Sequence, residues 1–149
     1  MLYLQDNYIR AGQMDDGSFR GSKPSRELDD TWILHNRPGA CFYSSTASGK
    51  WCVVRDPLAI DEAWQTICRL LGEGKLLAAK VSTKLARKIT GHDSHVICVY
   101  TTDWADEADV YRVRDVLRDA GFIEPLRYKR DLDTMRPELN PDREFYYED

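Results

Sequence analysis

The chain has 149 residues and a formal net charge of -4, and it includes 4 Trp, 8 Tyr and 4 Phe. This length and this supply of bulky apolar side chains suit one domain with a core of its own. The acidic balance argues against a protein that grips polyanions without specificity, because such proteins are usually basic overall.

Charges are nevertheless segregated along the chain. Residues 75–95 hold five Lys or Arg against Asp93, which gives 5 - 1 = +4, and residues 138–149 hold five Asp or Glu against Arg143, which gives 1 - 5 = -4. The first segment allows one local basic surface. The second predicts an acidic C-terminal tail over residues 135–149, which could be solvated or could dock on a basic protein partner.

The cysteines do not indicate a metal site. They lack a Cys-x-x-Cys pair, so we expect reduced thiols, no metal and no cofactor; the four are Cys41, Cys52, Cys68 and Cys98. No stretch predicts a signal peptide or a membrane span. The expectation is a cytoplasmic protein without a membrane partner.

The first third of the chain predicts a weakly ordered segment followed by short strands. Residues 1–28 contain frequent Gly and Ser and show poor apolar periodicity. A strand or a short helix is expected at residues 31–36, and strands are expected at residues 41–43 and 49–54.

Two helices are predicted from apolar stripes with the period of a helix that lies on a sheet. The first begins at Asp56, which can cap it, and ends at Gly72. Trp64 falls within this stripe, so we expect it in the core. The second helix is expected between residues 102 and 121, because Thr or Asp can cap its start and Gly stops it.

Further strands are expected at residues 76–83, 94–101 and 122–130, with a basic connection at 84–93 that suits a short helix. The element order predicts an α+β fold, in which a curved, mostly antiparallel sheet carries helices packed on one face. A single domain is expected over residues 29–134.

Alternation along residues 76–83 places Lys80 and Ser82 opposite an apolar set of the same strand. A charge in mid-strand costs free energy unless it is paired or reaches solvent or a ligand. Lys80 is therefore the first candidate for a binding site. An ion pair with Asp131 or Asp133 is the alternative, and the two readings carry equal weight.

Other candidates surround Lys80 in the predicted sheet. Histidine at the start of the central strand is more often structural than catalytic, and each Trp could pack in the core or stack on a base. Lysine and arginine in the last strand suit phosphate. The full set of candidate ligand-binding residues is Lys80, Ser82, His95, Tyr100, Lys129, Arg130, Trp51 and Trp32.

Several catalytic signatures are missing from the sequence. It contains no glycine-rich phosphate loop, no Gly-x-Ser-x-Gly elbow and no His-x-x-x-His pair. An enzyme acting on a phosphorylated substrate, a lyase or a hydrolase, would use Lys80 as base and His95 as acid. That reading requires the two side chains to open into one common pocket.

A longer set of motifs resembles a known family. Its segments are Ala79-Lys-Val-Ser82, His95-Val-Ile-Cys-Val-Tyr-Thr101, Asp109-Val110 with Arg112-Val113, and Tyr128-Lys129 with Asp131 and Thr134. Over about residues 49–134 the chain resembles the basophilic-leukaemia-expressed protein family, whose members share the fold of the cap-binding translation initiation factor 4E. The Gly-x-Tyr-like segment that closes the family pattern is absent after Thr134.

The resemblance implies a curved antiparallel sheet backed by helices, and it does not carry cap binding over. The initiation factor holds the methylated base between two Trp and reads it with a Glu, and those positions have no residue-by-residue match in this chain. Three hypotheses follow: a module that binds a nucleotide or an RNA end, an enzyme on a phosphorylated substrate, and a protein-interaction adaptor that uses its acidic tail.

Overall fold

The structure is a computed structural model that describes residues 8–10 and 23–149. A seven-stranded sheet organises it, with the strand order β1-β2-β4-β5-β3-β6-β7. The first two strands pair in parallel, and every other neighbouring pair is antiparallel. The strands are β1 (Tyr8–Arg10), β2 (Trp32–Asn36), β3 (Gly49–Arg55), β4 (Ala78–Ser82), β5 (His95–Thr101), β6 (Arg127–Arg130) and β7 (Tyr147–Glu148).

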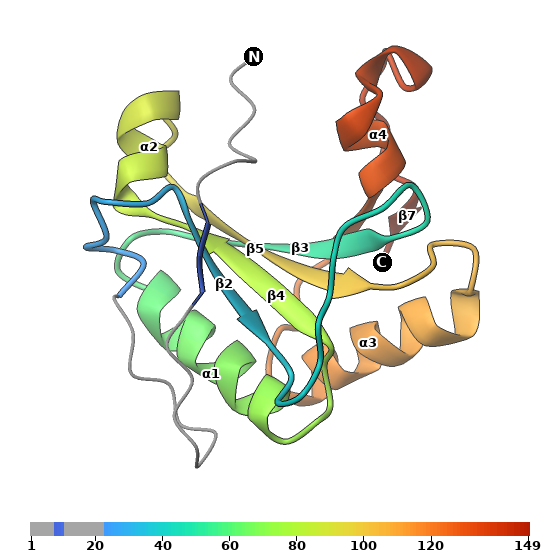
Figure 1. The fold of residues 1–149 in the computed structure, drawn as a ribbon, viewed down its shortest axis with the longest axis horizontal. Coiled ribbons are helices and arrows are strands. Elements are labelled where there is room, and N and C mark those ends of the chain that lie inside the picture. The colour runs from blue at the N-terminus through green and yellow to red at the C-terminus, as the bar shows by residue number, and fades with distance from the viewer. Residues whose placement is uncertain (1–7, 11–22) are drawn as a thin grey trace.

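The long helices α1 (Ile60–Gly72) and α3 (Glu107–Asp119) lie together on one side of the sheet (Figure 1). The short helices α2 (Lys84–Thr90) and α4 (Asp131–Met135) stand at two ends of the other side. A 3-10 turn, η1 (Pro137–Leu139), follows α4. The α+β fold with a curved, mostly antiparallel sheet and its main helices on one face is therefore confirmed.

The core lies between the sheet and the helices α1 and α3. The predicted stripe of α1 is buried there, with Trp64 fully buried as expected, and α3 buries Val110, Val113 and Leu117. Trp51 of β3 is also fully buried, and its Nε1 donates to the carbonyl oxygen of Val110 in α3 at 2.9 Å. Burial of each large apolar side chain contributes about 1.5–3 kcal/mol to folding.

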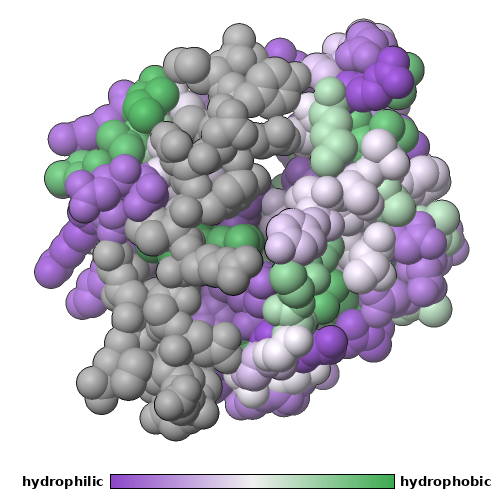
Figure 2. All heavy atoms as spheres, in the orientation of Figure 1, coloured by the Kyte–Doolittle hydropathy of each residue, from purple (hydrophilic) through white to green (hydrophobic). Residues whose placement is uncertain are grey.

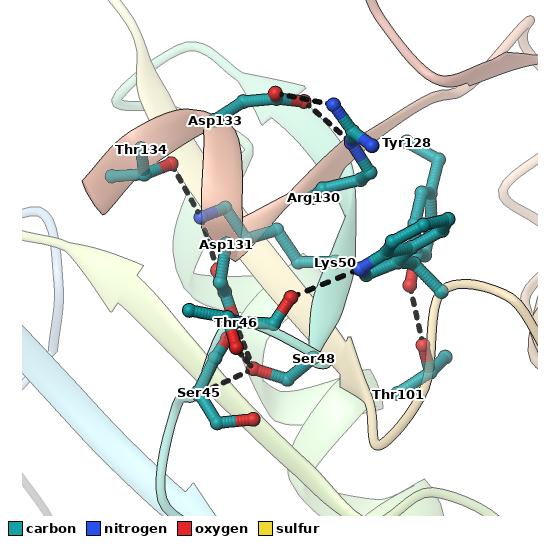
Figure 3. Close-up of polar contacts among 11 residues, drawn as sticks. Ser45, Thr46, Ser48, Lys50, Thr101, Tyr128, Arg130, Asp131, Asp133 and Thr134 are labelled. Carbon is teal, nitrogen blue, oxygen red and sulfur yellow. Dashed lines mark hydrogen bonds and ion pairs between the residues drawn. The ribbon is translucent and has the colours of Figure 1, made fainter. Parts of the chain in front are cut away.

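Position 49 is restricted to glycine by the adjacent side chain of Tyr128. A Cβ on Gly49 would lie 2.2 Å from Tyr128 Oη and 2.4 Å from its Cζ, so no larger residue fits while the ring stays in place. The ring is held because Tyr128 is fully buried and its hydroxyl shares a 2.6 Å hydrogen bond with Thr101 Oγ1 (Figure 3).

The sequence predicted a strand at residues 41–43, and that prediction is wrong. The segment is irregular, and Cys41 and Tyr43 are exposed. The reason is that β3 already pairs with β5 on one side and with β6 on the other, so no edge beside β3 is left for it. Residues 31–36 adopt the strand rather than the short helix.

The starts of α2 and α3 follow their capping residues, whereas α1 starts at Ile60, after a turn in which Asp56 Oδ1 accepts from the N–H groups of Leu58 and Ala59. The basic connection forms α2, whose first turn is capped by Thr83 Oγ1 accepting from the backbone N–H of Ala86. Helix α3 starts later than predicted, because Asp106 caps it and Asp103 instead accepts from the N–H of Ala105 in the preceding turn. Neither α4 nor β7 was predicted.

The C-terminal residues 135–149 do not lie apart from the domain. Strand β7 pairs with β6, and the backbones of Leu126 and Asp149 exchange two hydrogen bonds of 2.7 and 2.9 Å. The Tyr147 ring packs 5.4 Å from the Tyr128 ring between centroids. Most of the N-terminal segment predicted as weakly ordered, residues 1–28, lies outside the described residues.

Within residues 23–149, none of the helices has the length and apolar character that crossing a membrane requires.

Candidate functional site

The sheet face opposite α1 and α3 is termed the open face. Strand register places its side chains in rows, because directly paired residues point to the same side. One row across β2, β4, β5, β3 and β6 is Leu34, Lys80, Cys98, Cys52 and Arg127. The next row is Asn36, Ala78, Tyr100, Lys50 and Lys129.

Lys80 lies on the open face in contact with aromatic rings. Its Nζ is 4.1 Å from the Trp32 ring centroid and 6.0 Å from the Tyr100 ring centroid. Burial lowers the pKa of Lys80, and the nearby charge of Lys50 lowers it further. The ring faces attract the ammonium group and offset part of its lost hydration.

Lys50 is a second buried lysine on this face, and sequence reasoning missed it. Its Nζ lies 2.5 Å from Asp131 Oδ1 and 3.0 Å from Thr134 Oγ1 (Figure 3). Burial alone would lower the pKa of Lys50, but the charge of Asp131 and its hydrogen bond raise it overall. The sequence did contain a signal for it, because Lys50 is a charged residue inside the strand predicted at residues 49–54.

Asp131 is therefore engaged by Lys50. It also accepts a 2.5 Å hydrogen bond from Ser48 Oγ (Figure 3). The other predicted partner of Lys80, Asp133, forms a two-pronged pair with Arg130 at 2.8 and 3.0 Å. The ion pairs of these two carboxylates are thus with Lys50 and with Arg130.

Lys129 stands directly across from Lys50 in the β3–β6 register. It is half-buried and forms no ion pair with any residue that the structure describes. Like charges placed directly opposite on a sheet repel. With Lys80, the open face thus gathers three amines from β3, β4 and β6, and the carboxylate of Asp131 pairs with that of Lys50.

His95 does not join this group. It alternates with the open-face residue Cys98 along β5, so it points to the helix side, where it is 1% exposed. Its Nδ1–H donates to the Ser82 carbonyl oxygen at 2.7 Å, and burial lowers its pKa. Lys80 and His95 therefore lie on opposite faces of the sheet. The common pocket that the enzyme hypothesis requires does not exist.

Trp51 and Arg130 also lie away from the open face. Trp51 is a core residue, as its bond to α3 shows, so it cannot stack on a ligand. The Arg130 guanidinium contacts both the Trp104 and the Tyr146 ring, 4.8 and 4.9 Å from their centroids, while pairing with Asp133. Its Nε and Nη2 groups are engaged by the Asp133 carboxylate.

The remaining candidates do share the open face with Lys80 and Lys129. Ser82 Oγ accepts from the backbone N–H of Val96 at 2.9 Å, which holds the ends of β4 and β5 together. Tyr100 packs on Phe42 with 4.8 Å between ring centroids. The five predicted residues that the structure brings together are Lys80, Ser82, Tyr100, Lys129 and Trp32.

The basic connection contributes an exposed surface at one end of this face. Figure 2 shows hydrophilic and hydrophobic residues side by side over α2, where Lys88 and Ile89 are exposed. Arg87 donates to the carbonyl oxygen of His92, which fixes it to the end of its own helix. This helix is therefore a mixed surface beside the site.

The fold is an α+β fold of the kind found in initiation factor 4E. Caenorhabditis elegans eIF4E-3 in complex with the 4E-binding protein Mextli matches with a TM-score of 0.51 and 18% identity, over 66% of this chain and 63% of that one. The complex that also holds a cap analog gives 0.51 and 18%, over 74% and 64%. Ascaris suum eIF4E-3 with an m7G cap gives 0.47 and 18%, over 62% and 57%.

At this identity the likeness shows the fold alone, and the matched part is less than two thirds of each of those chains. A closer assignment comes from the family described as basophilic leukemia-expressed protein Bles03, whose sequence profile matches residues 43–135. The chain belongs to the Bles03 family.

Proposed function

We propose that the open face binds a phosphate-bearing ligand such as a nucleotide or an RNA end. The observation that carries the proposal is the gathering of Lys50, Lys80 and Lys129 on one face of four neighbouring strands. Ammonium groups held together repel unless an anion lies among them, and Lys129 stands opposite Lys50 without an ion pair to any described residue. A phosphate group would supply a counter-charge for Lys129.

Aromatic side chains next to these lysines support a nucleotide over a simple anion. Trp32 and Tyr100 lie on the same face within reach of Lys80 Nζ, and both rings are buried, Trp32 beneath Lys80 and Tyr100 against Phe42. A base can stack on such rings whatever its sequence once Lys80 or Phe42 moves off the ring face. The solved C. elegans eIF4E-3 complex with a cap analog shares the fold, which supports the proposal by analogy.

Asp131 is not proposed to form hydrogen bonds with the edge of a nucleotide base. Its carboxylate already accepts from Lys50 Nζ and from Ser48 Oγ. A base that took these positions would leave a buried ammonium without its partner, which costs several kcal/mol. The proposal is therefore for phosphate binding with base stacking.

Binding should be measured with GTP and with short RNAs that carry either a 5′-phosphate or a 5′-hydroxyl, at two salt concentrations. Lysine–phosphate contacts predict that affinity falls as salt rises, with a slope of about -0.7 for each contact on a single strand. Lys129→Met should lower the affinity and reduce the slope. Lys75→Met is the matched control, because Lys75 is exposed and pairs with Glu73 beyond the end of α1.

Lys80→Met separates a ligand role from a structural one, since it keeps the stem and removes the charge. If Lys80 serves the ligand, affinity drops while the melting temperature holds or rises. A lower melting temperature with unchanged binding would assign Lys80 to the fold. If none of the ligands binds, or if Lys129→Met and Lys80→Met bind like Lys75→Met, the proposal is wrong.

A further inference from the structure

Two cysteines face each other on the open face. Cys52 of β3 and Cys98 of β5 are direct register partners, and no disulfide joins them in the structure. Cys98 is buried and Cys52 is half-buried. The phosphate-binding proposal uses neither thiol, although they lie between Lys80 and Lys50 in the rows of the sheet.

The type of register pair decides how close these cysteines come. The Asp131 N–H donates at 2.9 Å to the carbonyl oxygen of Ser48, the residue before β3. Because N–H and C=O groups alternate in direction along a strand, the even-numbered residues of β3 direct theirs toward β6. Ala47 accepts from the Trp104 N–H on the β5 side, which agrees with this alternation. Cys52 and Cys98 are therefore a non-hydrogen-bonded pair.

Such pairs bring their side chains closest together. Their Cα atoms lie about 4.5 Å apart in antiparallel sheets. Disulfides join residues whose Cα atoms are about 4.4–6.8 Å apart. A bond between Cys52 and Cys98 is thus possible without moving either strand.

Neighbouring charges favour the thiolate, which is the reactive form of cysteine. The hydrogen bond from the Cys52 thiol lowers the pKa of Cys98; burial acts against it, and the charges of Lys80 and Lys50 lower it further. Lys80 is the direct register partner of Cys98 on β4. The site therefore holds a nucleophilic sulfur beside a second thiol.

The other cysteines provide an internal comparison. Cys68 is buried in α1 among core residues, and burial raises its pKa. Cys41 is exposed in an irregular segment. Neither of them has a cysteine as a register partner on the sheet.

We propose that Cys52 and Cys98 form a reactive dithiol site, which a peroxide converts reversibly into a cross-strand disulfide. The Cys98 thiolate attacks one peroxide oxygen, the O–O bond breaks, and the departing hydroxide takes up a proton to leave as water. The resulting sulfenic acid is attacked by the Cys52 sulfur; the S–O bond breaks, and a second water leaves with the Cys52 proton. Two thiols lose two electrons, and hydrogen peroxide gains them.

Reduction by a small dithiol reverses the step through a mixed disulfide. Where glutathione keeps thiols reduced, bonds of this kind are transient rather than structural. The proposal concerns the cysteine pair alone, so it stands or falls separately from ligand binding.

The experiment treats the reduced full-length chain with one equivalent of hydrogen peroxide at pH 7, then alkylates it under denaturing conditions. Mass spectrometry of a non-reducing digest should find the Cys52 and Cys98 peptides linked, with the loss of two hydrogen atoms, and dithiothreitol should separate them. Cys68 should be recovered alkylated. Recovery of Cys52 and Cys98 as alkylated thiols to the same extent as Cys68 would overturn the proposal, as would Cys98 found only as sulfinic acid.

The rate tests the role of the lysine. Lys80→Met should slow disulfide formation near neutral pH and move the midpoint of the pH–rate profile upward, because the thiolate loses a neighbouring positive charge. Lys75→Met and Cys41→Ser should leave both the rate and the profile unchanged. An unchanged profile in Lys80→Met would overturn the assignment of Lys80, while the linked peptide in the unsubstituted chain tests the dithiol itself.

Discussion

Lys50 in β3 and Asp131 at the start of α4 form a buried ion pair, with 2.5 Å between Nζ and Oδ1, that joins the middle of the sheet to the C-terminal segment. The same carboxylate accepts from Ser48 Oγ, and the Asp131 N–H donates to the Ser48 carbonyl oxygen. Asp131 therefore fixes the position of α4 while it neutralises a lysine that stands opposite Lys129.

Asp131→Asn should lower the free energy of unfolding by about 3–5 kcal/mol, because it leaves the buried Lys50 charge without its partner. Urea unfolding followed by Trp fluorescence measures the loss. The raised pKa of Lys50 means that the pair stabilises the fold fully below the unfolded value of 10.5. Its contribution is lost as pH rises through the higher folded value.

Two variants control this prediction. Glu73→Gln breaks exposed pairs with Arg69 and Lys75, so it should leave the free energy of unfolding almost unchanged. Lys50→Met combined with Asp131→Asn should recover part of the loss, since no unpaired charge remains. A cost for Asp131→Asn no greater than that of Glu73→Gln would contradict the buried pair.

Gly49→Ala should destabilise the protein by about 1–3 kcal/mol, because the added Cβ would overlap the Tyr128 ring. Thermal unfolding measures this directly. Tyr128→Phe should not rescue Gly49→Ala, since ring carbons at 2.4 and 2.6 Å remain in place after the hydroxyl is gone. On its own, Tyr128→Phe removes the bond to Thr101 and should cost about 0.5–1.5 kcal/mol. A fully stable Gly49→Ala chain would show that the ring can move.

Local patterns predicted the elements that carry their own periodicity. The stripes of α1 and α3 and the alternation in β5 are visible in a few successive residues. Strand β7 and helix α4 are too short to show a period, and they form because β6 and Ser48 offer them partners. Such long-range pairing is not encoded in any single window of sequence.

The site was predictable where alternation alone decides which face a residue occupies. Lys80 opposes the apolar set of β4, so its place on the open face followed from the pattern. In β3 both faces include apolar residues, so alternation did not reveal that Trp51 faces the helices. Lys50 is separated from Asp131 by 81 positions, and the sequence does not show that the two meet.

The stability of the protein should decrease as pH falls below about 6.5, in part through His95. Burial lowers the pKa of His95 from its model-compound value of 6.5, so the unfolded chain binds this proton more readily than the folded one. Stability is therefore full above the unfolded pKa and is lost as pH falls toward the folded one. His35 shifts in the same direction, so its contribution adds to this slope.

His95→Asn should flatten the decrease, since Asn keeps a donor for the Ser82 carbonyl oxygen and does not titrate. Urea midpoints between pH 5 and pH 7.5 measure the slope. His92→Asn changes an exposed histidine and is the matched control. If His95→Asn and His92→Asn keep equal slopes, His95 does not contribute to the pH dependence.

The last prediction concerns residues 144–149, which the adaptor hypothesis would assign to a partner. In the structure they belong to the fold: Tyr147 Oη donates to the Trp104 carbonyl oxygen at 3.0 Å, and Arg114 pairs with the Asp149 carboxylate. Arg118 also donates to the Asp149 carbonyl oxygen at 2.5 Å. Deleting residues 144–149 removes β7 and uncovers the buried Tyr128 ring.

The truncated chain should therefore lose about 2–5 kcal/mol of unfolding free energy, comparable to deleting a large core side chain. Equilibrium urea unfolding provides the measurement. Asp142→Asn with Glu144→Gln removes exposed acidic charge while it keeps the aromatic residues, so it should change stability by no more than about 0.5 kcal/mol. If the truncated chain instead unfolds at the same urea midpoint as the full-length chain, these residues are not part of the fold. They would then be available to bind a protein partner, as the adaptor hypothesis requires.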